Sequence, residues 1–269
     1  MTANALSRTE TTVPRRPGIP RAWRRVGSVV GFVALWYVVA HLKLTSPLFL
    51  PPPDAVLDIG LQLVGRGELQ RHVLVSLTRI FQGFTAGSLV GIFIGILMGQ
   101  VRTIRLLLRP SIELIRPIPA LVWIPLVLIW FGIGESGKIF LIAYGVFFIV
   151  VTNTFDGVQS VDRQLIRAAQ SLGANPRQIF LYVLLPAALP QIATGLSLAV
   201  GTAFSVLVAA ELLAATAGLG WMITDARRFF RTDIVLLGMA LIGLIGFTLV
   251  SIVNALQRRF LSWHASSRA

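Results

Sequence analysis

The sequence predicts an all-α, polytopic membrane protein with six transmembrane helices. Three observations lead to this fold class. Hydrophobic residues make up 55% of the 269-residue chain and charged residues only 13%, roughly half the charged fraction of a soluble domain. Six stretches of 17 to 33 residues carry no charge. Each stretch is continuously apolar, whereas the strands of a membrane β-barrel alternate in polarity over roughly ten residues.

The charge-free stretches define the spans, because a bilayer core about 30 Å thick needs roughly 20 apolar helical residues. They lie between Arg25 and Lys43, Arg79 and Arg102, Arg116 and Glu135, Lys138 and Asp156, Arg177 and Glu211, and Asp233 and Arg258. In the fifth stretch, Pro186 and Pro190 are expected to break the helix. We therefore expect a transmembrane domain over residues 23–263, between a disordered cytoplasmic tail (1–22) and a short cytoplasmic C-terminal tail (264–269).

The positions of Arg and Lys predict the orientation of the spans. If both termini are cytoplasmic, the inner segments hold 15 Arg and Lys residues and the outer segments hold seven. Positive residues collect on the cytoplasmic side of membrane proteins, so both termini are expected inside. This distribution explains the net charge of +13 by the orientation of the protein in the membrane, so the basic composition does not indicate nucleic-acid binding. On the expected outer side, Arg227, Arg228 and Arg231 would steer anions or contact a binding protein or lipid phosphates.

The second span carries a glycine at every fourth position. These residues are Gly83, Gly87, Gly91, Gly95 and Gly99. They line one helix face, and membrane helices associate through close packing of small residues because lipid tails are as apolar as Leu. The ladder predicts a packing seam, either against another helix of the same subunit or at a subunit interface.

Patterns for catalysis, metal binding and nucleotide binding are weak. The chain has no cysteine and three scattered histidines, so no metal site is expected. Residues 132–138 match a phosphate-loop pattern but join two spans and are followed by Ile139 instead of Ser or Thr. Near the spans, Glu113 is either a functional group or the i,i+3 partner of Arg116. Glu211 is either a functional group or a carboxylate at the membrane interface.

The expected cytoplasmic loop at 160–186 has the pattern of two short helices joined at a glycine. Asp162 is placed to cap the first helix, and Gly173 to end it in a left-handed conformation. Asn175 is placed to cap the second helix, with Gln178 completing a capping box, and the two prolines are expected to close it. The apolar stripe of the first helix consists of Leu165, Ile166, Ala169 and Leu172. Such a rigid hairpin suits docking to a partner, although a surface hairpin without a partner has the same pattern.

Residues 167–186 resemble the EAA loop of the permease subunits of ATP-driven (ABC) importers. The family pattern is E-A-A, three residues, G, nine residues and I-x-L-P. The matching positions are Ala168, Ala169, Gly173, Leu185 and Pro186. Arg167 stands where Glu is usual, and Val183 replaces Ile. Because Arg167 reverses a charge expected to help dock the ATPase, either the partner ATPase presents a compensating acidic group, or the coupling pair is weakened, or the usual Glu is dispensable here.

Further stretches resemble the subfamily that handles nitrate, sulfonates, taurine and bicarbonate. They are residues 116–120, 123–125, 130–134, 218–220 and 231–233. Relatives that move pyrimidine-type vitamin precursors share such stretches, so that substrate class stays an alternative. The resemblance runs from the first span to about residue 263 and implies a type I (MetI-like) importer permease architecture.

The resemblance also implies partners and site residues. Two permease subunits, expected as a homodimer, pair in the bacterial inner membrane, two cytoplasmic ATPase subunits each bind one loop, and an external binding protein delivers the solute. ATP and Mg would bind the ATPase, so no cofactor and no enzymatic activity are expected in this chain. The coupling residues would be Arg167, Ala168, Ala169, Leu172, Gly173, Arg177, Leu185 and Pro186. The translocation pathway is expected near Pro119, Trp123, Ser205 and Glu211.

Two other classes of protein remain as alternatives. A secondary transporter without an ATPase would show internal repeats and ionisable residues at mid-membrane. A membrane enzyme would need a polar catalytic cluster at one interface. Neither feature is visible in the sequence, which favours the importer permease.

Overall fold

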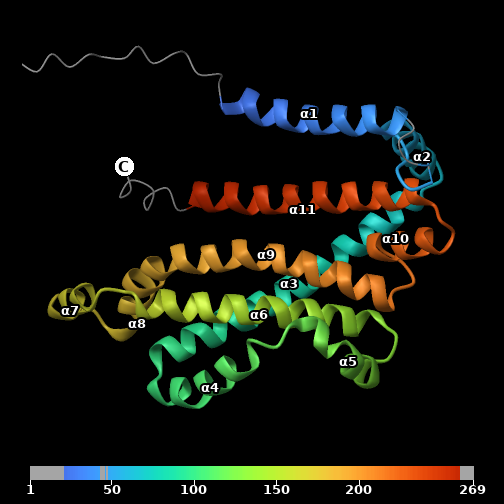
Figure 1. Cartoon of the computed structure of the whole chain (residues 1–269). Helices are drawn as coiled ribbons and strands as arrows, with labels where there is room; N and C mark the ends of the chain where they lie inside the picture. Colours follow the sequence, from blue (N-terminus) through green and yellow to red (C-terminus); the bar gives the residue numbers. More distant parts are fainter. Residues whose placement is uncertain (1–20, 43–45, 47, 261–269) are drawn as a thin grey trace, which may run out of the picture. The chain divides into compact units, whose positions relative to one another are not determined.

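The computed structural model describes residues 21–42, 46 and 48–260, and every regular element in these ranges is helical (Figure 1). The chain divides into two compact units, residues 1–54 and 55–269. The first unit contains α1 (Arg21–His41), which begins inside the tail predicted at 1–22; the rest of that tail, and the tail at 264–269, lie outside the described residues. Within this unit the Trp36 indole donates a hydrogen bond of 3.2 Å to the Pro51 carbonyl.

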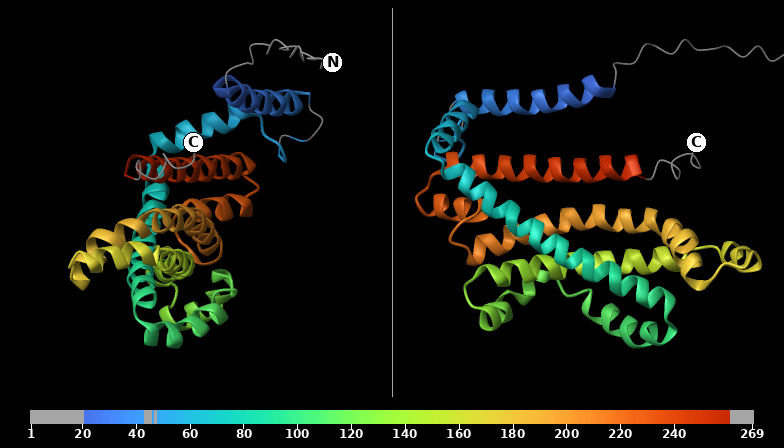
Figure 2. Two further views of the ribbon diagram at one scale, coloured as in Figure 1. Left: turned by 90° about the vertical axis from the view of Figure 1, so that its left-hand side faces the viewer. Right: turned by 180° about the vertical axis from the view of Figure 1, so that it is seen from behind.

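The helices after α1 are joined by short turns and can be followed in two further views (Figure 2). They are α2 (Pro53–Gly65), α3 (Glu68–Gln100), α4 (Arg102–Ile115), the 3₁₀ helix η1 (Ala120–Trp123), α5 (Ile124–Phe131), α6 (Glu135–Gln159), α7 (Arg163–Ser171), α8 (Pro176–Ile179), the π-helix η2 (Phe180–Leu184), α9 (Leu185–Ala214), α10 (Leu219–Arg228) and α11 (Thr232–Phe260).

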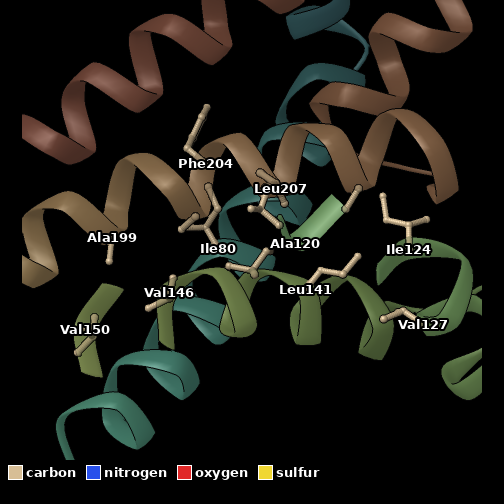
Figure 3. Close-up of a cluster of buried hydrophobic side chains, with 14 residues drawn as sticks. Ile80, Ala120, Ile124, Val127, Leu141, Val146, Val150, Ala199, Phe204 and Leu207 are labelled. Carbon is tan, nitrogen blue, oxygen red and sulfur yellow. The ribbon is translucent and has the colours of Figure 1, made fainter. Parts of the chain in front are cut away.

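The core of the second unit is built on α6, which packs along both α3 and α9. Ile142, Val146 and Val150 of α6 have 0% exposure. Side chains of α9 and of the η1–α5 segment, such as Ala120 and Leu207, join the same cluster (Figure 3). The continuous apolar runs of the sequence therefore become helices that bury one face and leave the other free.

The glycine ladder lies at the contact between α3 and α6. An added Cβ at Gly83 would come within 2.6 Å of the Ile142 Cβ, and one at Gly95 within 2.6 Å of the Thr154 Cβ. The other three glycines face Val146, Val150 and Val158 in the same way. The seam is therefore within the subunit, one of the two arrangements that the sequence allowed, and it lets two backbones approach closely.

Four helices in the described residues are long and apolar enough to cross a membrane. They are Glu68–Gln100, Glu135–Gln159, Pro176–Leu212 and Thr232–Gln257. A fifth span arises if the bent pair Arg102–Ile115 and Ala120–Phe131 counts as one. The apolar part described for the first predicted span, Val30–His41, is shorter. A multi-span helical membrane protein is confirmed, whereas the exact count of six is not.

The third predicted span is not a straight helix. The chain bends by 86° between α4 and the η1–α5 segment. Pro119 adopts an extended conformation at this bend, with φ −61° and ψ 141°, since a proline and the residue before it both resist helix continuation. The eight residues of α5 would cover only about 12 Å at about 1.5 Å per residue. This segment packs against α6 instead of crossing the bilayer alone.

The prediction that Pro186 and Pro190 end the second loop helix is wrong. The helix runs without a break from Pro176 to Leu212. Directly before Pro186 it widens into the π-helical η2, where the Leu185 N–H bonds to the Phe180 carbonyl. Proline lacks an N–H and its ring crowds the preceding turn, so a wider turn at this point accommodates it. Pro190 then lies inside α9.

Candidate functional site

The predicted hairpin is present, and its caps are the expected ones. The Asp162 side chain accepts from the Gln164 N–H at 2.8 Å. Gly173 has φ +80°, and the Ala174 N–H bonds to the Ala169 carbonyl at 3.0 Å, which closes α7 in a Schellman motif. A capping box between Asn175 and Gln178 starts α8. Local sequence therefore determines the geometry of this hairpin.

The surface of the hairpin is free within the subunit. None of the residues of α7 is buried. In the predicted apolar stripe, Leu165 is 53% exposed and Leu172 is 88% exposed. Six of the expected coupling residues lie on the hairpin: Arg167, Ala168, Ala169, Leu172, Gly173 and Arg177. The other two, Leu185 and Pro186, lie at the start of α9. An exposed apolar stripe on a rigidly capped element suits the docking of another protein.

A cavity of about 320 Å³ lies between the bend at residues 116–120, α6 and α9. Pro119 and Ser205, two of the predicted pathway residues, line it together with Arg116, Tyr144 and Thr202. The rest of the lining is apolar and consists of Ile118, Ala120, Leu121, Gly145, Phe148, Ile149 and Val206. The cavity thus combines a few polar groups with apolar walls, as small-molecule sites do.

Trp123, the third predicted pathway residue, lies behind this cavity rather than in its lining. Its indole N–H donates to the Tyr144 hydroxyl at 2.9 Å. That hydroxyl is 3.3 Å from the Ile118 carbonyl at the bend. Trp123 and Tyr144 therefore hold the bent segment against α6.

Glu211, the fourth predicted pathway residue, is in a buried ion network and does not line the cavity. Its carboxylate accepts from the Arg79 guanidinium at 2.6 Å, the Ser76 hydroxyl at 2.8 Å and the Gly220 N–H at 2.9 Å. Its side chain has 0% exposure and lies three residues before the end of α9 at Ala214, so the carboxylate is paired inside the bundle near one end of the span. Neutralisation by Arg79 is what allows a carboxylate to be buried here.

The same network continues to α6. Arg79 also pairs with Glu135 through two nitrogens, and Lys138 donates to Glu135 at 3.0 Å. Arg79 is only 2% exposed and lies inside α3, whereas the sequence indicated a charge at the edge of a span. The network joins α3, α6 and α9 at the end of the unit opposite the hairpin.

The observed ion pairs decide the partner of Glu113. They also describe the arginine cluster, whose expected contact with anions, a binding protein or lipid phosphates stays a prediction. Glu113 pairs with Arg109 at 2.7 Å, in an i,i+4 arrangement on α4, and not with Arg116 as expected. In the arginine cluster, Arg227 and Arg228 are exposed, and Arg231 pairs with Asp233 at 2.8 Å. The hydrogen bond to Asp233 raises the pKa of the Arg231 guanidinium above its ordinary value.

Sequence reasoning missed Arg116, Tyr144 and Thr202 as cavity residues and Arg79 as a buried ion. The 86° bend brings Arg116 to α9, and no periodicity predicts that bend. Arg79 was detectable in principle. It precedes the glycine ladder by four residues, so it lies on the face that packs against α6, and a cation on a packed face needs a buried partner.

Comparison with known proteins gives three findings. The profile of the family described as binding-protein-dependent transport system inner membrane component matches residues 87–262. The chain is 48% identical over 244 residues to the taurine transport system permease protein TauC of Escherichia coli (strain K12), covering 89% of each chain. It is 38% identical over 267 residues to the putative aliphatic sulfonates transport permease protein SsuC of Bacillus subtilis (strain 168), covering 98% of this chain and 97% of the relative.

A solved structure is similar in fold as well. A chain of the MetNI methionine ABC transporter in an inward-facing conformation matches with a TM-score of 0.52 and 26% sequence identity. The match covers 69% of the present chain and 95% of that chain. The arrangement of α-helices described above is therefore one that has been observed before in a membrane transporter.

Proposed function

Because the chain belongs to the family of binding-protein-dependent transport system inner membrane components, we propose that it forms the translocation pathway of an ATP-driven importer for taurine and related short-chain sulfonates. The fold is the type I importer permease architecture. Support for the substrate class comes from the chain's similarity to the permeases for taurine and for aliphatic sulfonates.

The observation that carries the proposal is the exposed hairpin that continues without a break into α9. The stripe with Leu165 and Leu172 is free to bind a cytoplasmic ATPase subunit, and ATP and Mg would bind that subunit. Arg167 is exposed on α7, where it would meet an acidic group of the ATPase. The hairpin end then faces the cytoplasm, with both termini on that side.

The mechanism follows from the connection between the hairpin and α9. Closure of the paired ATPase subunits on ATP would move the two hairpins of a permease homodimer, and the uninterrupted helix Pro176–Leu212 would carry that movement past the cavity beside Ser205. An external binding protein would deliver the sulfonate to the opposite end in the bacterial inner membrane. Transport requires that nucleotide and solute bind the two states with different affinity.

A pair of variants on the hairpin, one inside α7 and one at the residue that follows it, tests the docking surface. Leu172→Asp should remove most of the ATPase that copurifies with the permease, because it puts a carboxylate into the apolar stripe. Gln170→Asp introduces the same charge on the same exposed hairpin outside the stripe and should retain the ATPase. Both variants are compared by subunit stoichiometry after detergent extraction and by ATP-dependent taurine uptake in proteoliposomes. Equal ATPase recovery from the two variants would exclude this surface as the docking site.

A further inference from the structure

The cavity beside Arg116 lies about a third of the way along the core helices. Tyr144 is nine residues from the start of α6 at Glu135, and Ser205 is nine residues before the end of α9 at Ala214. At about 1.5 Å per residue, both lie about 14 Å from that end of the bundle, inside helices that are long enough to cross a hydrocarbon core about 30 Å thick. A charge facing a cavity at this depth is costly, and such charges mark substrate or ion pathways.

Arg116 differs from its charged neighbours in having no side-chain partner within the described ranges. Arg105 donates to the carbonyls of Met98 and Gly99 at 3.0 and 2.8 Å. Arg109 pairs with Glu113. Arg116 is exposed; it lines this cavity and also a smaller neighbouring cavity of about 70 Å³ that contains Glu113 and Asp156. Its guanidinium, free of any partner among the described residues, matches the planar array of oxygens of an oxyanion.

The other polar groups of the cavity lining are hydroxyls. Thr202 makes no hydrogen bond through its side chain in the part of the chain that the structure describes, so its hydroxyl is available as a donor. The Ser205 hydroxyl donates to the Gly201 carbonyl at 3.1 Å and keeps its lone pairs. The lining contains no carboxylate. Its formal charge is therefore that of Arg116 alone.

We propose that Arg116 and Thr202 bind the sulfonate group of the transported solute inside this cavity, with its alkyl part against Phe148, Ile149 and Val206. This inference rests on the proposed import function and assigns the substrate site within it. The apolar walls favour an organic sulfonate over nitrate or bicarbonate, because an inorganic oxyanion would leave them without a contact. The bend at Pro119, held by the Tyr144 hydroxyl, presents Arg116 to the cavity.

Thiol labelling tests the anion site independently of transport. The chain has no cysteine, so Ser205→Cys creates a single reactive position in the cavity. The assembled importer is labelled with a methanethiosulfonate that carries a sulfonate and with one that carries a quaternary ammonium, and each rate is divided by its rate with a free thiol. The normalised rates should favour the anionic reagent about tenfold or more, since a cavity of one charge sign concentrates counter-ions.

Arg116→Gln in the Ser205→Cys background should abolish this preference, and Arg116→Lys should retain it. Arg109→Gln removes the same charge from α4, just before the bend, at a residue outside the cavity, and should leave the preference unchanged. A normalised ratio that favours the cationic reagent in the unaltered cavity, or an equal ratio with and without Arg116, would overturn the proposal. If Arg116→Gln prevents assembly, the ratio at Ser205→Cys with Arg116 present still decides.

Transport provides the second measurement. Uptake of taurine per ATP hydrolysed should fall at least tenfold in Arg116→Gln and by less in Thr202→Val, with normal recovery of the ATPase. Unchanged uptake in Arg116→Gln contradicts the site. If the unaltered importer transports no sulfonate while the labelling preference persists, the proposed substrate is wrong and the anion site stands.

Discussion

Arg79 shows how a single residue can organise one end of a membrane bundle. Its guanidinium contacts the carboxylates of Glu135 and Glu211 and the carbonyl of Ala217. Three helices and the turn after α9 therefore share one cation. A buried ion pair is costly to break, because the partner that remains has neither water nor a counter-charge.

The Arg79→Leu variant should lose about 3–5 kcal/mol of unfolding free energy, since it leaves the Glu211 carboxylate buried without its cation. Denaturant titration in detergent micelles measures this loss. Arg109→Gln is the matched control, because it breaks an ion pair whose two side chains are 54% and 61% exposed. Its effect should be much smaller. Similar losses in the two variants would contradict a structural role for the buried network.

At the scale of the element, the contact between α3 and α6 depends on backbone proximity. The glycines of α3 allow side chains of α6 such as Ile142, Val146 and Val150 to lie directly against its backbone. Because α6 also packs along α9, the contact between α3 and α6 supports the two helices, α6 and α9, whose residues line the cavity. Any side chain on the ladder separates α3 from the rest of the core.

Gly87→Val should destabilise the bundle by about 1–3 kcal/mol or more, because its Cβ would lie 2.9 Å from the Val146 Cβ and closer still to the Ala143 carbonyl. Gly243→Val makes the same change in α11, where no atom lies within 4 Å of an added Cβ. The two variants are compared by unfolding in detergent. A larger loss at Gly243 would show that the ladder is not under steric constraint.

Elements governed by local chemistry could be predicted from the sequence, and those governed by tertiary contacts could not. Asp162, Gly173 and Asn175 act on neighbouring backbone groups, so the hairpin has the predicted caps. The continuity through Pro186 depends on a π turn, and the bend at Pro119 depends on contacts with α6. Pro119 and Ser205 line the same cavity, and their place in the translocation pathway stays a prediction, whereas Arg116 enters the cavity only through that bend.

At the scale of the whole molecule, force transmission depends on one long helix. The hairpin, η2 and α9 form a single connection from an exposed docking surface to the cavity. Such a connection transmits a displacement only if it resists bending. Its weakest point is η2, because π turns are rare and are accommodated in place of regular hydrogen bonding.

A double variant at η2 tests this transmission. Tyr182→Gly with Val183→Gly should leave ATPase binding intact but lower taurine uptake per ATP hydrolysed several-fold, because each glycine weakens a helix by about 1 kcal/mol. The control, Tyr182→Ala with Val183→Ala, removes the same side chains and keeps helix propensity. Taurine uptake per ATP hydrolysed is measured for both double variants in proteoliposomes. Equal coupling in the two variants would mean that the movement reaches the cavity by another route.

The π turn has a geometric consequence for assembly. An α-helix advances by about 100° per residue, and a π turn accommodates one additional residue without breaking the rod. Because the wider turn absorbs the rotation of the additional residue, loss of that residue would return η2 to regular α-helical hydrogen bonding and leave the orientation of the helix before Phe180 nearly unchanged. A residue inserted in or deleted from the α-helical part between Pro176 and Leu212 would instead turn the docking face by about 100° relative to the cavity. The direction in which that face points therefore depends on the length of the helix as well as on its own side chains.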